Sequence, residues 1–140
     1  NMIRFEDKYF QKFDFTSEQI EKNFANALKD LNIAKMDKIL EVKFNYAYTA
    51  LIKGGIALLS YYKVKVKSAP GHHIMIIDKI AQILKDDSIS DVGNVMRSKR
   101  NLDLYSGGID VTEKESREYI SFIENALEKI AKIVRGYSMK

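Results

Sequence analysis

The residues of this chain best suited to chemistry are cations and polar side chains in its second half. They lie in the stretch RSKRNLDLYSGG, residues 97–108, as Arg97, Arg100, Asn101 and Tyr105. Guanidinium groups bind phosphate oxygens through paired hydrogen bonds, and an amide adds a directional donor. On a helix, the two arginines and the asparagine fall on one polar flank. This pattern is typical either of a phosphate site or of a charged helix end that complements the helix dipole.

Two adjacent histidines, His72 and His73, begin another expected helix. Neighbouring side chains on a helix point about 100° apart, and no Asp or Glu follows four residues later, so we expect no metal site. The sequence indicates no cofactor either. Two interpretations of the histidines stay open: one packed and one solvated residue at a helix start, or a contribution to an interface or an RNA-binding cleft.

Composition limits the class of protein. The 140 residues fit one domain, residues 1–140, and Asn1 before Met2 resembles a cloning remnant. With no cysteine, disulfides and thiolate catalysis are excluded and a cytoplasmic location is favoured. A net charge of +4 permits binding to nucleic acid or nucleotide phosphates without requiring it. The longest weakly charged run, residues 54–62, is too short to span a membrane, so no membrane partner is expected.

Apolar residues recur at steps of three and four along the chain, which predicts an all-α fold. Residues 1–15 are expected to be irregular, residues 63–67 to form a lysine-rich connector, and no strand is expected. Five helices are expected to begin near residues 16, 36, 70, 90 and 112, the first and last with capping boxes. Five helices with short links imply an up-and-down four-helix bundle with an additional N-terminal helix.

Two of these helices carry patterns that bear on packing. Gly54 and Gly55 in mid-helix cost about 1 kcal/mol each relative to alanine, which favours close packing as their role. Ala50 and Ala57 extend the small-residue face on which Gly54 lies. The helix that carries the arginines is expected to bury four apolar residues: Val92, Val95, Met96 and Leu102.

Three segments together resemble the HEPN superfamily, the higher eukaryote and prokaryote nucleotide-binding domains. They are FNYAYTAL at 44–51, SAPGHH at 68–73, and MRSKRNLDLYSGG at 96–108, the last followed by a capped amphipathic helix. Their order and spacing match over roughly residues 36–133. The resemblance implies an up-and-down bundle that is usually dimeric. Many members are metal-independent ribonucleases of toxin-antitoxin and defence systems, and others are noncatalytic partners of minimal nucleotidyltransferases.

The family's ribonuclease motif is an arginine, a polar residue and, a few positions later, a histidine. Arg100 and Asn101 match its first two positions, but Tyr105 occupies the histidine position. A free tyrosine has a pKa of about 10 against about 6.5 for histidine, so it is a poor general base that can still donate a hydrogen bond. Some members carry a nucleotidylated tyrosine near this motif, so the resemblance also makes Tyr105 a candidate acceptor, although Tyr105 does not match the position that those members modify. His73 matches a histidine that recurs in related sequences.

Helix geometry favours a dimer. On one helix, Arg100 and Tyr105 point about 140° apart and lie about 7.5 Å apart along the axis, so one protomer aims them poorly at one phosphate. A two-fold interface would place Arg100 of one protomer beside Tyr105 of its partner. The face containing Gly54 is expected to help close that interface.

The leading hypothesis is a HEPN-type domain that forms a homodimer, binds nucleotide or RNA, and acts with a minimal nucleotidyltransferase in a toxin-antitoxin or defence-like system. Arg97, Arg100, Asn101 and His73 would hold phosphate, and Tyr105 would orient it. The first alternative is a metal-independent endoribonuclease in which Arg100 stabilises transition-state charge and His73 or Tyr105 replaces the missing histidine. The second is a noncatalytic scaffold in which this cluster only stabilises the dimer.

Overall fold

The computed structural model describes residues 3–106 and 108–136, and within residues 102–106 it describes the backbone alone. The described part contains five helices and one two-stranded antiparallel sheet. They are, in chain order, β1 (Phe10–Lys12), α1 (Ser17–Met36), α2 (Leu40–Tyr61), β2 (Val64–Val66), α3 (His72–Leu84), α4 (Asp87–Ser106) and α5 (Glu113–Val134). The prediction of an all-α helical bundle is confirmed.

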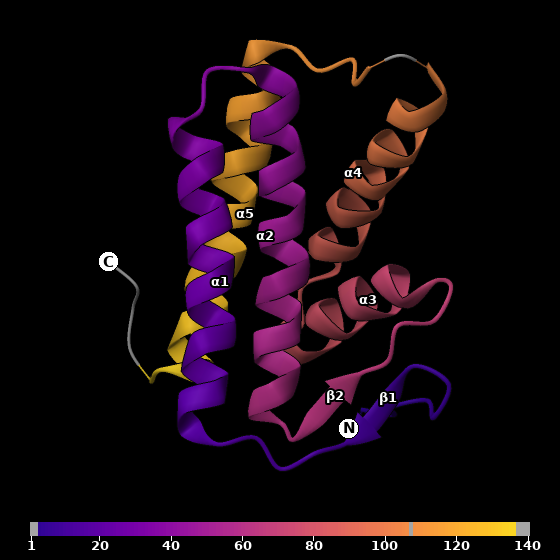
Figure 1. Ribbon diagram of the computed structural model, residues 1–140, viewed down its shortest axis with the longest axis vertical. Coiled ribbons are helices and arrows are strands. Elements are labelled where there is room, and N and C mark those ends of the chain that lie inside the picture. Colours follow the sequence, from indigo (N-terminus) through magenta and orange to yellow (C-terminus); the bar gives the residue numbers. More distant parts are fainter. Residues whose placement is uncertain (1–2, 107, 137–140) are drawn as a thin grey trace.

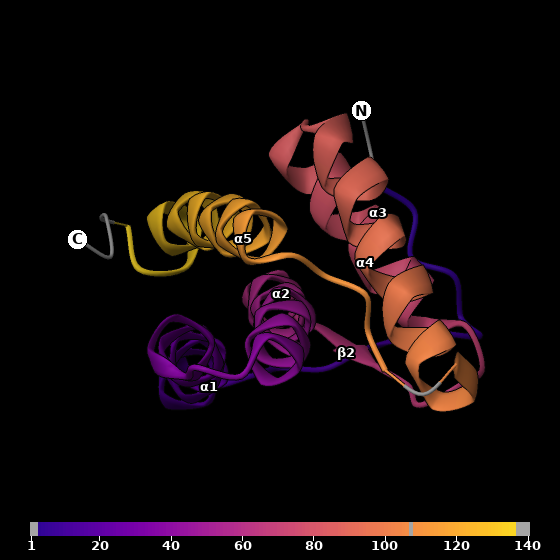
Figure 2. The same ribbon diagram turned by 90° about the horizontal axis from the view of Figure 1, so that it is seen from above.

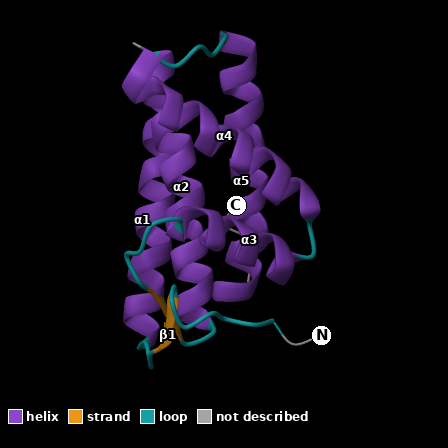
Figure 3. Cartoon of the chain, turned by 90° about the vertical axis from the view of Figure 1, so that its right-hand side faces the viewer, coloured by secondary structure: helices purple, strands orange, loops and turns teal. Residues whose placement is uncertain are grey.

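The helices form two groups that meet at α2. The long helices α1, α2 and α5 pack side by side, and the α3–α4 pair packs against α2 (Figures 1 and 2). Along the chain, α1, α2, α4 and α5 alternate in direction, whereas α3 lies across them between β2 and α4 (Figure 1). The sheet lies at one end of the bundle (Figure 3). No helix in the described ranges is long and apolar enough to cross a membrane.

Side-chain caps fix where two of the helices begin, as the sequence predicts. Thr16 Oγ1 accepts from the Gln19 N–H at 3.1 Å, and Gln19 Oε1 accepts from the Thr16 N–H at 2.9 Å. Thr112 and Glu115 form the same reciprocal pair before α5, with both distances 3.0 Å. Each box satisfies two backbone donors that the first helical turn leaves without partners.

Two other helix starts differ from the prediction. The Asp37 carboxylate accepts from the Ile39 N–H at 2.9 Å, and this turn separates α1 from α2. As a result, α2 begins at Leu40, whereas the prediction placed its start at Met36. Helix α4 begins at Asp87 rather than near Ser90, because the break after α3 consists of Lys85 and Asp86 alone.

The sheet corrects the prediction that the N-terminal segment and the lysine-rich connector lack strands. Phe10 pairs with Val66 and Lys12 with Val64, and the Phe13 N–H donates to the Lys63 carbonyl at 3.0 Å. Phe10 and Val64 are buried, which ties the sheet to the core. Each strand spans three residues, too few for an alternating pattern to be recognised, and each is completed only by a partner distant in the chain.

The mid-helix glycines of α2 contact two different helices, which confirms their predicted packing role. A Cβ on Gly54 would collide with Leu127 of α5, and one on Gly55 would lie 2.5 Å from Ile76 Cγ2 of α3. Ala50, Gly54 and Ala57 are all buried within the chain. The expectation that this face closes a dimer is therefore wrong, because α5 already covers it.

Candidate functional site

Helix α4 packs against the core through Val92 and Met96, as predicted, but not through Val95. Met96 is fully buried as expected, but Val95 is 48% exposed, so its predicted burial is wrong. The close contact is made instead by Gly93, where a Cβ would lie 2.8 Å from Ile77 Cγ2 of α3. Arg97 and Arg100 lie beside this contact on the flank of α4, and both are partly buried.

Arg97 and Asn101 of α4 line a cavity of about 380 Å³ together with the histidines at the start of α3. We call it the α3–α4 cavity. Gly71 is the N-cap of α3, with φ at +85°, and it provides no side-chain cap for the helix. The His72 N–H already donates to the Ala69 carbonyl at 3.0 Å, and the N–H groups that follow it in the first turn suit an anion because they have no partner within the helix. Gly71 itself lines the cavity, and the remaining lining residues are Ser68, Ala69, Pro70 and Ile74.

The structure thus gathers most of the residues that the sequence singled out. Arg97, Asn101 and His73 line the α3–α4 cavity itself, and His72 does so as well. Arg100 lies beside the cavity, within electrostatic range of His73. Predictions on Tyr105, and on burial of Leu102, concern side chains outside the described part of the chain, so the pairing of Tyr105 with Arg100 stays a prediction.

A buried tyrosine connects His73 and Arg100, and the sequence analysis missed this role. Tyr48 of α2 is fully buried, and its hydroxyl lies 3.0 Å from His73 Nδ1. The Arg100 guanidinium stands over the Tyr48 ring, 5.4 Å from its centroid, in a cation–π contact. The sequence does contain a signal for this contact, because a tyrosine on an apolar helix stripe buries a hydroxyl group that needs a hydrogen-bond partner.

Hydrogen bonding determines which nitrogen of each histidine carries the proton. The Tyr48 hydroxyl has no other hydrogen bond within the described residues, so it donates to His73 Nδ1 and leaves the proton on Nε2. His72 Nδ1 lies 2.8 Å from the Ala69 carbonyl oxygen, which can only accept, so this nitrogen is protonated. When both rings are neutral, Nε2 of His73 is therefore a hydrogen-bond donor, and Nε2 of His72 is an acceptor.

The local electrostatics keep His73 neutral. Burial is the largest cause, followed by interaction with His72 and the charges of Arg100 and Arg97, and together they lower the pKa of His73 to about 4. Burial also raises the pKa of Tyr48 to about 12, against the opposing influence of the two arginines. At neutral pH, the positive charge beside the cavity therefore comes from the arginines.

Neither arginine has a carboxylate partner among the side chains that the structure describes. Arg97 Nε donates to Asn94 Oδ1 at 3.3 Å, a contact that leaves its terminal nitrogens available. Arg100 contacts the Tyr48 ring. Partly buried cations are usually paired, because removing charge from water costs free energy that an opposite charge offsets. This pair of arginines therefore suits an anionic ligand.

The described side chains contain no group of three His, Asp or Glu residues that would hold a metal ion. No protein-family model matches the chain, and comparisons with curated proteins and with solved structures find no match.

Proposed function

We propose that this chain is a HEPN-type helical domain that binds phosphate groups of a nucleotide or RNA in the α3–α4 cavity. The observation that carries the proposal is the pair of partly buried arginines, Arg97 and Arg100, which lack a carboxylate partner in the described part and adjoin an open cavity. Phosphate supplies the negative charge and the oxygen acceptors that these groups require.

Each polar group has a distinct part in the proposed binding. Arg97 donates to phosphate oxygens through its terminal nitrogens, and Asn101 adds an amide donor from the next helical turn. The protonated Nε2 of His73 is a third donor, which Tyr48 holds in one tautomer. Arg100 contributes charge from beside the cavity, where burial strengthens its effect relative to an exposed cation.

The resemblance extends the proposal to partners. Members of the HEPN superfamily are usually dimeric, and some act with minimal nucleotidyltransferases in toxin-antitoxin or defence systems. We therefore propose that this chain forms a homodimer and acts with a minimal nucleotidyltransferase. Tyr105, in the position of the family's catalytic histidine, favours holding phosphate over cleaving it, since an ordinary tyrosine keeps its proton at neutral pH.

Fluorescence anisotropy with a labelled single-stranded RNA tests the proposal. Arg97→Ala is expected to weaken binding about tenfold or more, because it removes charge-assisted hydrogen bonds. The matched control is Arg117→Ala, which removes an exposed arginine of α5 that pairs with Glu113 at 3.5 Å. The control variant is expected to stay within about twofold of wild type. Equal losses in both variants would mean that only net charge attracts the RNA.

The ribonuclease alternative keeps one favourable observation: Tyr48 links His73 to Arg100, so a histidine does lie near the matched arginine. Cleavage of single-stranded RNA by metal-free protein, abolished by Arg100→Ala, would establish that alternative. If Arg100→Ala instead leaves RNA binding unchanged and converts a dimer to a monomer, the cluster is a dimer scaffold.

A further inference from the structure

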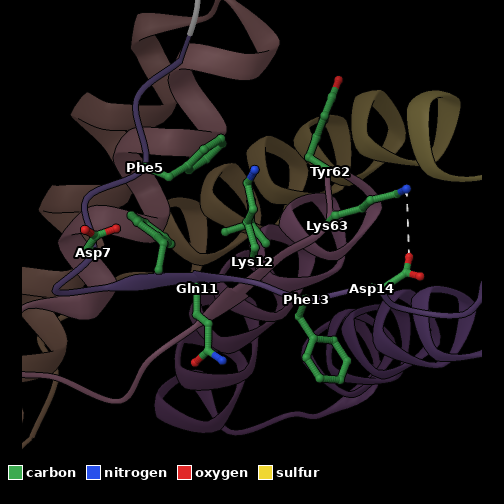
Figure 4. Close-up of a pocket in the computed structure, with 10 residues that line it drawn as sticks. Phe5, Asp7, Gln11, Lys12, Phe13, Asp14, Tyr62 and Lys63 are labelled. Carbon is green, nitrogen blue, oxygen red and sulfur yellow. Dashed lines mark ion pairs between the residues drawn. The ribbon is translucent and has the colours of Figure 1, made fainter.

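A second and larger cavity lies beside the sheet and shares no lining residue with the α3–α4 cavity. It measures about 770 Å³, and we call it the sheet cavity (Figure 4). Its lining contains aromatic and apolar side chains, among them Phe5, Phe10, Tyr62 and Val64, together with two lysines, Lys12 and Lys63, and two aspartates, Asp7 and Asp14.

The sheet cavity has an apolar base and an aromatic wall. Phe10 and Val64 line it and are buried, whereas Tyr62, at the end of α2, is 45% exposed. Figure 4 shows Lys12 extending from β1 between Phe5 and Tyr62. A flat aromatic ligand thus has an exposed ring to stack on and an ammonium group close by.

The segments around the sheet cavity carry most of the net charge of the chain. Residues 7–14 and 63–67 contain five lysines and two aspartates, a net charge of +3 in a chain whose total is +4. One aspartate, Asp14, pairs with Lys63 at 3.9 Å, and both side chains are largely exposed. Lys65 stands over the Phe13 ring, 5.2 Å from its centroid. Within the lining itself, Lys12 and Lys63 are balanced by Asp7 and Asp14, so the excess positive charge of these segments comes from Lys8, Lys65 and Lys67.

We propose that the sheet cavity binds a base of a single-stranded nucleic acid, which stacks on Tyr62 while Lys12 and its neighbouring lysines contact the flanking phosphates. Exposed rings within a basic surface are the recurring means of binding single strands, because every base has a π face and every nucleotide a phosphate. The lysines of the flanking segments, together with the exposed Tyr62 ring, favour this ligand over an apolar protein segment. The inference does not depend on the α3–α4 cavity.

The test measures binding of a fluorescein-labelled uridine strand of about 12 nucleotides, within the range that such sites cover. Tyr62→Ala is expected to weaken binding about fivefold or more, and Tyr62→Phe, which keeps the ring, to stay within about twofold. Lys12→Gln is expected to weaken binding. It is also expected to lower the slope of the logarithm of the binding constant against the logarithm of salt concentration by about one unit. The control is Tyr46→Ala, which removes a tyrosine of α2 that is 36% exposed and outside the cavity. This variant is expected to bind the uridine strand as wild type does.

A strand of the same length without bases separates stacking from charge. Wild type and Tyr62→Ala are expected to bind the abasic strand equally, and the loss caused by Tyr62→Ala on the uridine strand is expected to persist in Arg97→Ala protein. The proposal is overturned if Tyr62→Ala binds the uridine strand as wild type does. Displacement of that strand by an acidic peptide as effectively as by unlabelled strand would also overturn it.

Discussion

The neutral state of His73 yields the sharpest prediction about the α3–α4 cavity. Burial and the nearby charges lower the pKa of His73 from 6.5 to about 4. At pH 5.5 an ordinary histidine is about 90% protonated, whereas His73 is expected to be about 3% protonated. Its ring therefore stays a neutral hydrogen-bond donor through the whole range in which exposed histidines become charged.

The same pKa shift makes stability depend on pH with a definite sign. Because the folded-state pKa lies below the unfolded value, the unfolded state binds more protons below pH 6.5. The stability linked to neutral His73 is therefore complete above about pH 6.5 and is lost as the pH falls toward 4. Each pKa unit corresponds to about 1.36 kcal/mol, and since His73 is only partly buried, solvent screening reduces the expected loss to about 1–2 kcal/mol.

Two measurements check this reasoning. An NMR titration of the histidine Cε1–H resonances is expected to place the midpoint of His73 near pH 4. Tyr48→Phe, which removes the hydrogen bond donated to neutral Nδ1, is expected to raise that midpoint by about half a unit to one unit. Urea unfolding at pH 7 and 4.5 is expected to show a smaller acid-induced loss in His73→Gln than in wild type. A wild-type midpoint close to 6.5 would refute the reasoning.

Two further predictions concern the stability of the fold, one through helix packing and one through a buried ion pair. Gly54→Ala is expected to destabilise the fold by about 1–3 kcal/mol, because the added methyl group collides with Leu127, and thermal melting measures the loss. The cost of Gly54→Ala is expected to be smaller in a Leu127→Ala background than in wild type, and equal costs in the two backgrounds would argue against this contact as the cause. Glu6→Gln is expected to cost about 1–2 kcal/mol, because Lys79 is 3% exposed and pairs with Glu6 at 3.0 Å, while Asp78 at 3.9 Å still offsets part of its charge. Chemical denaturation of Glu6→Gln and of Glu6→Gln/Lys79→Met compares the two, and the double variant is expected to be the more stable.

The parts of the fold that follow local rules were predictable from the sequence. Thr16 and Thr112 cap helices because a hydroxyl and a side-chain acceptor three residues later suffice, whatever the rest of the chain does. The packing of Gly54 and Gly55 was predictable because glycine in mid-helix lowers stability relative to alanine. Close approach of a neighbouring helix, which alanine would block, explains why glycine is present there. The strands were not, because β1 and β2 are stable only as a pair formed by distant segments.

The candidate site was predictable in its members but not in its arrangement. Arg97 and Asn101 were selected by residue type and His73 by the family resemblance, and all three line one cavity. Helical periodicity could not tell which apolar residue of α4 faces inward, because Gly93 packs closely and leaves Val95 exposed. The contact between Tyr48 and His73 depends on how α2 meets α3, which no spacing within either helix encodes.

Phosphate binding in the α3–α4 cavity is tested most directly by amide chemical shifts of ¹⁵N-labelled protein titrated with a nucleoside monophosphate. The expected result is that the largest shifts fall at residues 71–74, 97 and 101, and that they disappear in Arg97→Ala protein. Saturating nucleotide that leaves these amides unshifted, or that shifts them equally in Arg97→Ala, would contradict the proposed function.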